Sequence, residues 1–197
     1  LGDAAWRGAY TFALVRNPFA RQLSMFTFLL QNASCKQPAG KRPPHCEERL
    51  LPFAGPWLND QKAVATAYQA WIRRLAAKFP AGGPTAHLFG SRSHGNEHDR
   101  WFNASQISWL TDSQGSLLVR EVIRLEDLRD KWHMLQAAIC GVRNVSYADP
   151  AAEARRNPSA HAHYSAYYDE PTRRIVESYV RADLAAFGYS FEQRGGA

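Results

Sequence analysis

The apolar positions near the start of the chain change their spacing after residue 15. Tyr10–Val15 is a short, continuously apolar run, which predicts a strand buried on both faces of a parallel sheet. Asn17 and Pro18 then suit the N-cap and the first position of a helix. The apolar residues that follow share one helical face, at spacings of four, three and four: Phe19, Leu23, Phe26 and Leu30.

Three more helices and one more strand are predicted downstream. Asp60 can cap a helix whose apolar stripe is Val64, Tyr68, Trp71, Leu75 and Phe79. Residues 86–116 are mixed and polar, with at most short helical pieces, and 117–123 then indicates a strand. A helix closed by Gly141 is marked by Leu128, Trp132, Leu135 and Ile139. The last helix is capped by Asp169, ends before Gly188, and packs through Ile175, Val176, Tyr179, Val180 and Leu184.

Strands that alternate with helices argue for an α/β domain around a mainly parallel sheet. A single domain over residues 1–197 is expected, because no boundary divides the pattern. Residues 31–58 are predicted to be an excursion without regular structure, since five prolines interrupt them.

Composition adds a preference for anionic partners and for an oxidising compartment. The formal net charge is +6, which a solvated basic surface would also explain. Three glycosylation sequons occur, at Asn32, Asn103 and Asn144, where chance predicts about 0.7. Cys35 and Cys46 flank a Pro-rich basic loop that a disulfide could pin. The lumen of the secretory pathway is therefore the expected location.

The turn after the first strand carries the main chemical signal. A strand delivers Arg16 to its carboxyl end, where ligands bind in open α/β sheets. The helix that starts at Pro18 directs its free N–H groups and its positive dipole end toward an anion. Arg16 adds a planar fork that matches phosphate oxygens. Ser24 lies about two helical turns after Pro18 and can face the same side, while Arg21 either stays near the site or points to solvent.

Residues 14–24 (LVRNPFARQLS) resemble the 3′-phosphate-binding motif of Golgi-type carbohydrate sulfotransferases, which commonly reads R-[DN]-P-[YF]-x-R-x-x-S. The match covers the six characteristic positions: Arg16, Asn17, Pro18, Phe19, Arg21 and Ser24. The resemblance implies that Arg16 and Ser24 bind the 3′-phosphate of the sulfate donor PAPS. It also implies a P-loop-NTPase-like sulfotransferase fold, release of PAP as product, and a glycan or glycoprotein acceptor. The implied location is the Golgi lumen, as a type II membrane protein, or the extracellular space.

Two later segments resemble the same family. Residues 101–135 contain a glutamine segment, an acidic-glycine turn and a strand ending in R-x-E-x-L, in which Glu126 is expected to form an ion pair with Arg124 or to act at a helix start. Residues 157–191 match an N-x-S-x-H loop and a helix ending in Y-x-x-D-x-x-x-F-G-Y, interpreted as packing and C-capping residues. Arg156, Asn157 and His161 in the basic loop would close over the nucleotide, touch a sulfated glycan, or simply be solvated.

The resemblance leaves one part of the family pattern unmatched. The turn that binds the 5′-phosphosulfate, and the general base usually near it, are expected upstream of Leu1, because residues 1–10 contain no such turn. The alternatives are an N-terminally incomplete enzyme, with a membrane anchor possible upstream, and a catalytically inactive sulfotransferase-like module in a secreted or membrane assembly. No catalytic residue is assigned.

Other functions have weaker support in the sequence. His94 and His98 are spaced as helical zinc ligands, but Gly95 lies between them and a third ligand is lacking, so no metal is expected. The basic residues are scattered along the chain, which argues against a role in binding nucleic acid. No apolar run approaches the roughly 18 residues of a membrane-spanning helix, so contact with a membrane is expected only through an upstream anchor.

Overall fold

The computed structural model describes residues 6, 8–31, 60–78, 105–140 and 162–192. These residues form mostly helices and a small parallel sheet of two strands, so the predicted α/β class is confirmed at that level. They group into two compact units, each of which is described by itself. The first unit comprises Leu1–Asn17 and Gln106–Pro158, and the second comprises Pro18–Ser105 and Ser159–Ala197. The single domain over residues 1–197 stays a prediction.

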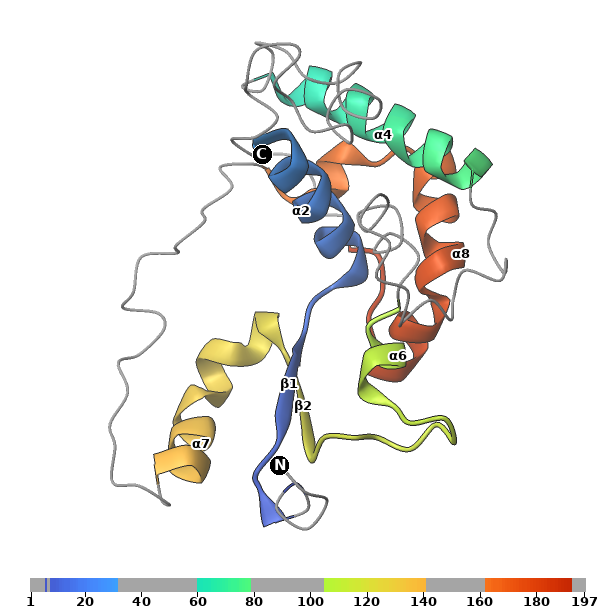
Figure 1. Cartoon of the computed structure of the whole chain (residues 1–197). Helices are drawn as coiled ribbons and strands as arrows, with labels where there is room; N and C mark the ends of the chain where they lie inside the picture. The colour runs from blue at the N-terminus through green and yellow to red at the C-terminus, as the bar shows by residue number, and fades with distance from the viewer. Residues whose placement is uncertain (1–5, 7, 32–59, 79–104, 141–161, 193–197) are drawn as a thin grey trace, which may run out of the picture. The chain divides into compact units, whose positions relative to one another are not determined.

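The first unit is built on the parallel pair β1 (Phe12–Val15) and β2 (Glu121–Arg124). The register runs from Phe12 opposite Glu121 to Val15 opposite Arg124. β2 leads through the 3₁₀ turn η5 (Leu125–Asp127) into α7 (Leu128–Cys140), which lies against the sheet (Figure 1). Ile123 of β2 and Leu135 of α7 are buried, as a core on one side of the sheet requires.

The sequence predicted longer and more deeply buried strands than the structure has. β1 begins at Phe12 instead of Tyr10, and β2 begins at Glu121 instead of Leu117. Phe12 and Leu14 are 37% and 46% exposed, so the prediction of burial on both faces is wrong for β1. The physical reason is that the sheet has only two strands among the described residues, and an apolar run cannot report how many layers cover it.

A compact turn explains why the predicted strand at 117–123 starts late. The carboxylate of Asp112 accepts hydrogen bonds from the backbone N–H groups of Gln114 (2.8 Å) and Ser116 (2.9 Å). Gly115 takes a positive φ of 82°, a conformation that favours glycine. Leu117 then forms an antiparallel bridge with Thr111, which is the residue that follows the short helix α6 (Ile107–Leu110). These local bonds occupy backbone groups of the segment that the sequence pattern assigned to a longer strand.

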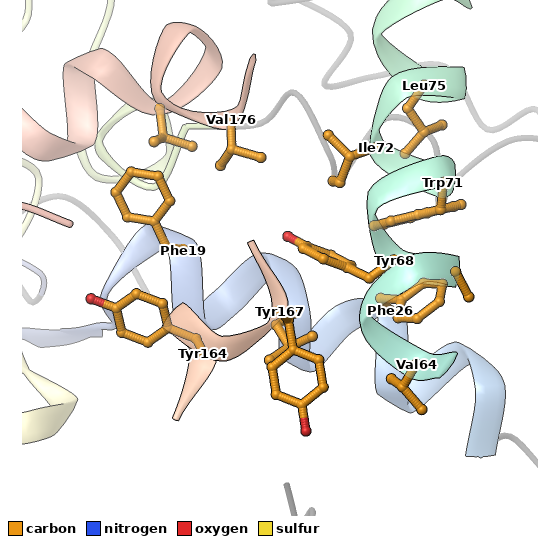
Figure 2. Close-up of a cluster of buried hydrophobic side chains, with 13 residues drawn as sticks. Phe19, Phe26, Val64, Tyr68, Trp71, Ile72, Leu75, Tyr164, Tyr167 and Val176 are labelled. Atoms are coloured by element: carbon orange, nitrogen blue, oxygen red, sulfur yellow. The ribbon is translucent and has the colours of Figure 1, made fainter. Parts of the chain in front are cut away.

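In its described residues, the second unit packs three helices and a 3₁₀ turn around an aromatic core. These elements are α2 (Pro18–Gln31), α4 (Gln61–Lys78), η6 (Tyr164–Tyr167) and α8 (Glu170–Phe187). The helix α2 includes Gln31, the first residue of the predicted Pro-rich excursion. Figure 2 shows the core, to which Phe26 of α2 and Tyr68 and Trp71 of α4 contribute. Their rings lie close together, with centroids 5.2 Å apart for Phe26 and Trp71 and 5.4 Å apart for Phe26 and Tyr68.

The predicted apolar stripes of these helices are confirmed wherever their side chains are described. In α2 the stripe residues Phe19, Leu23 and Phe26 are buried, and in α4 the buried ones are Val64, Tyr68, Trp71 and Leu75. In α8, Val176 and Val180 are buried, while Ile175, Tyr179 and Leu184 pack against the core from its edge. Helical spacing therefore placed the core of this unit correctly.

Both ends of α8 follow their sequence signals. The side chain of Asp169 accepts a hydrogen bond from the backbone N–H of Thr172 at 2.9 Å, and Asp60 caps α4 in the same way through Lys62 and Ala63. Gly188 ends α8 in the left-handed conformation, with φ 62°, and its N–H bonds the carbonyl of Leu184. A left-handed C-terminal residue is strained for any side chain, which is why glycine is favoured there.

We expect Asp169→Ala to lower the free energy of unfolding of the second unit by about 1 kcal/mol at pH 7, the usual cost of a lost N-cap. Desolvation raises the pKa of the Asp169 carboxyl, but hydrogen bonds from Thr172 and the attraction of Arg73 outweigh it, so the pKa is lowered overall. Because the folded-state pKa is depressed, this stabilisation is present above the unfolded value of about 4 and is lost as the pH falls through the folded value.

Urea unfolding at pH 7 and at pH 2.5 measures the effect. The difference between wild type and Asp169→Ala should narrow at pH 2.5, and Asp169→Asn, which keeps a capping oxygen but loses the charge, should fall between wild type and Asp169→Ala at pH 7. A difference of the same size at both pH values would show that the carboxylate charge has no part in the cap.

Candidate phosphate-binding site

The candidate site in the first unit is the turn that follows β1. Strand pairing ends where Val15 lies opposite Arg124, and Arg16 and Asn17 continue the chain to the start of α2 at Pro18. The side chain of Arg16 is half-buried. The order of strand, arginine and helix start is the one that the sequence predicted.

The backbone of Arg16 is held on both of its polar groups by one side chain. The Oε1 atom of Gln106 accepts a hydrogen bond from the Arg16 N–H at 3.0 Å, and its Nε2 atom donates to the Arg16 carbonyl at 2.9 Å. The carboxamide thus pairs with Arg16 as a neighbouring strand would, at a point where the pairing with β2 has ended. Gln106 precedes α6 and makes no capping bond to that helix, so its amide group serves the β1 turn.

The next backbone group of the turn is held by a carboxylate. The Oε1 atom of Glu126, in η5, accepts a hydrogen bond from the Asn17 N–H at 2.8 Å. The sequence had suggested an ion pair with Arg124 or a helix-start interaction for Glu126; the bond to Asn17, 109 residues earlier in the chain, is one that it did not foresee. A hydrogen bond from a backbone N–H to an ionised carboxylate is stronger than a hydrogen bond between two neutral groups.

The candidate residues of the second unit lie on α2. Phe19, at the aromatic position of the motif, is fully buried and packs its ring against Tyr164, Tyr168 and Phe191. The Tyr168 hydroxyl donates to the Phe19 carbonyl at 2.9 Å and lies 2.5 Å from the hydroxyl of Tyr68. Burial raises the pKa of both tyrosines, so their hydroxyls stay protonated and the first turn of α2 stays anchored.

Arg21 is half-buried, and its guanidinium is close enough to Asp183 of α8 to be attracted by the carboxylate. Burial lowers the pKa of Arg21, and this attraction partly offsets the effect. Asp183 itself is fully buried and accepts a hydrogen bond from the Ser105 hydroxyl at 2.5 Å. Arg21 is therefore engaged inside the second unit, which answers the question of whether it points freely to solvent, and Asp183 acts as its counter-charge besides being part of the packing.

Ser24 is half-buried in the second turn of α2, and its carbonyl accepts a hydrogen bond from Thr27 at 3.1 Å. Arg16 belongs to the first unit and Ser24 to the second. Each is placed within its own unit, and their joint contact with one phosphate stays a prediction.

Several predicted residues lie outside the described part of the chain. They are the loop residues Arg156, Asn157 and His161, the sequons at Asn32, Asn103 and Asn144, the cysteines Cys35 and Cys46, and the histidines His94 and His98. Their roles stay predictions. His163, two residues after His161, is described: its Nδ1 atom lies 2.9 Å from the Ser165 hydroxyl and accepts a hydrogen bond from the Ser165 N–H, so it caps η6.

Sequence reasoning missed the two side chains that hold the turn. Both lie in the segment that resembles the family pattern of a glutamine followed by R-x-E-x-L, and that pattern was the available signal. The sequence indicated no role for Gln106 itself and assigned Glu126 to Arg124 or to a helix start, because a contact across about one hundred residues leaves no trace in local spacing.

Searches for other kinds of site are negative in the described ranges. Among residues 6, 8–31, 60–78, 105–140 and 162–192, no group of three or more His, Cys, Asp or Glu side chains is placed to hold a metal ion. The helices described there include none that is long and apolar enough to cross a membrane.

Comparison of the chain with protein-family models, curated proteins and solved structures gives no match.

Proposed function

We propose that this chain is a carbohydrate sulfotransferase, or the nucleotide-binding part of one, that transfers a sulfuryl group from PAPS to a glycan hydroxyl. The observation that carries the proposal is the turn at Arg16: an arginine directly after a strand, whose backbone is held by Gln106 and Glu126, and which is followed by the helix α2. The match of residues 16–24 to the 3′-phosphate motif supplies the identity of the ligand.

The residues present fit a phosphate group. A guanidinium binds phosphate through two parallel hydrogen bonds, and a fixed backbone spares the ligand the cost of ordering the turn. The proposal gives Arg16 this role, and the resemblance assigns the Ser24 hydroxyl to the same 3′-phosphate. Arg21 is attracted by the carboxylate of Asp183, so the proposal gives it a structural role in the motif and no contact with the phosphate.

The donor supplies the sulfuryl group when it is bound. An oxygen of the acceptor hydroxyl forms a bond to sulfur, the bond between sulfur and the bridging phosphate oxygen breaks, and PAP leaves with the electron pair. The hydroxyl proton passes to a general base. In this scheme Arg16 and Ser24 do not take part in bond breaking; they fix the nucleotide so that the sulfur is in line with the acceptor.

The test is a titration of the wild-type chain with PAP and with adenosine 5′-phosphate, which lacks the 3′-phosphate. We expect PAP to bind at least about tenfold more tightly, the scale of one charged hydrogen-bonded contact. Equal affinities would remove the basis of the proposal. If PAP is preferred but no sulfuryl group passes from PAPS to desulfated glycans, the proposed nucleotide binding stands, and the result fits both an N-terminally incomplete enzyme and the alternative of a sulfotransferase-like binding module.

A further inference from the structure

We infer that Gln106 and Glu126 are positioning residues, which fix the backbone of Arg16 and Asn17 so that the Arg16 guanidinium is presented to the 3′-phosphate. This inference rests on the proposed function for its ligand and on the geometry of the first unit for its mechanism. The two side chains and the backbone groups that they hold are called the Arg16 clamp below.

The clamp holds backbone groups just beyond the last paired residues of the sheet. The register ends at Val15 and Arg124, and the Arg16 and Asn17 groups follow directly. Three hydrogen bonds of 3.0, 2.9 and 2.8 Å, from two side chains, hold the N–H and the carbonyl of Arg16 and the N–H of Asn17. A turn held in this way has fewer conformations than a free turn, so a ligand that binds it has less conformational entropy to overcome.

The three bonds of the clamp are made to main-chain atoms. Gln106 bonds the N–H and the carbonyl of Arg16, and Glu126 bonds the N–H of Asn17, so the conformation of the turn is fixed through its backbone. Side chains that bond a backbone in this manner are typical of sites in which a ligand-binding residue must be held within a fraction of an ångström.

The carboxylate of Glu126 brings a negative charge to a turn that is proposed to bind an anion, and such a charge weakens phosphate binding. Its benefit must therefore come from its acceptor oxygen on the Asn17 N–H, not from its charge. This distinction makes the conservative substitution Glu126→Gln informative, because it keeps an acceptor oxygen and removes the charge.

Two measurements on the full chain distinguish the existence of the Arg16 clamp from its role in phosphate binding. The first is hydrogen exchange of the Arg16 and Asn17 amides, measured by NMR without ligand. We expect Gln106→Leu to accelerate exchange at Arg16, and Glu126→Ala to accelerate it at Asn17, by about tenfold or more, because each removes the acceptor of that amide. Gln114→Leu is the matched control: Gln114 is an exposed glutamine of the same unit. Unchanged exchange in both clamp variants would overturn the clamp itself.

The second readout is the ratio of affinities for PAP and adenosine 5′-phosphate. An unfolded fraction lowers both affinities equally, so this ratio does not respond to a merely structural loss. We expect the ratio to fall about five- to tenfold in Gln106→Leu and Glu126→Ala, and to stay within about threefold of wild type in Glu126→Gln and Gln114→Leu.

A pH-dependent variant sharpens the assignment of Gln106. Gln106→Glu keeps the acceptor for the Arg16 N–H but loses the donor for the Arg16 carbonyl. We expect a reduced ratio at pH 7.5 and a recovery toward the wild-type ratio, measured at the same pH, near pH 5, where a carboxyl beside a carbonyl oxygen takes up the missing proton.

The failures of the two ideas are distinguishable. A wild-type chain that binds PAP more tightly than adenosine 5′-phosphate, with clamp variants that keep the wild-type ratio, overturns the positioning role and leaves the proposed function intact. A wild-type chain that does not distinguish the two nucleotides overturns the proposed function and the role toward phosphate together, and the exchange rates still decide whether the turn is clamped.

Discussion

Replacing Phe19 by alanine is expected to destabilise the second unit by about 3–5 kcal/mol, the usual cost of removing a buried aromatic ring. The ring is fully buried, and its centroid lies 4.9 Å from that of Phe191 and 5.7 Å from that of Tyr168, both in edge-to-face contact. The loss combines the transfer of the ring out of water with a cavity that three neighbouring rings cannot close.

Urea unfolding followed by circular dichroism measures this loss. Phe12→Ala is the control with the same chemistry, because Phe12 is 37% exposed in β1, and it should cost less than about 1 kcal/mol. Similar losses in the two variants would mean that the aromatic core around Phe19 is not formed as described. A large loss in Phe19→Ala alone would also bear on function. It would mean that the aromatic residue of the R-N-P-F motif anchors α2 in the core and does not contact a ligand.

Replacing Arg16 by alanine is expected to weaken PAP binding by about 1.5–3 kcal/mol, which corresponds to roughly 10- to 150-fold in affinity. The guanidinium is the one charged donor that the proposal assigns to the 3′-phosphate, so its loss leaves that phosphate without its main partner. Arg16→Lys should fall between wild type and alanine, because an ammonium keeps the charge and loses the two-pronged geometry.

Isothermal titration with PAP gives these affinities directly. Arg129→Ala removes an exposed arginine from α7 in the same unit and controls for the change in net charge. If Arg16→Ala and Arg129→Ala bind PAP equally well, the assignment of the phosphate to Arg16 is wrong.

The parts of the fold that the sequence predicted well are those with local causes. Pro18 starts α2, Asp169 caps α8 and Gly188 ends it, because each residue type has a conformational preference that acts within one turn of helix. The stripe of α4 was equally readable, since residues three and four apart must share a face in any helix.

The sheet was harder to predict because its pairing is not local. The apolar run at Tyr10–Val15 identified a strand, but Phe12 and Leu14 are exposed, and only the arrangement of strands in space decides that. Leu117 is drawn into a bridge with Thr111 by the turn that Asp112 closes, so side-chain bonds to the backbone overrode a strand-like composition.

The candidate site divides in the same way. Arg16 could be found from sequence because a charged residue directly after an apolar strand is a local anomaly with a chemical meaning. Gln106 and Glu126 could not be assigned their partners, because they reach the turn from 90 and 109 residues away. Asp183 was interpreted as packing, and its buried carboxylate also attracts Arg21, a pairing that only the three-dimensional structure supplies.

The most direct test of the central claim observes the Arg16 guanidinium itself during binding. The Nε–H resonance of Arg16 in a ¹⁵N-labelled chain, assigned by its loss in Arg16→Lys, is followed while PAP or adenosine 5′-phosphate is added. The account predicts a downfield shift and slower solvent exchange with PAP and little change with adenosine 5′-phosphate, because only PAP carries the phosphate that this group is proposed to bind. Saturation with PAP that leaves the Arg16 resonance unchanged would contradict it.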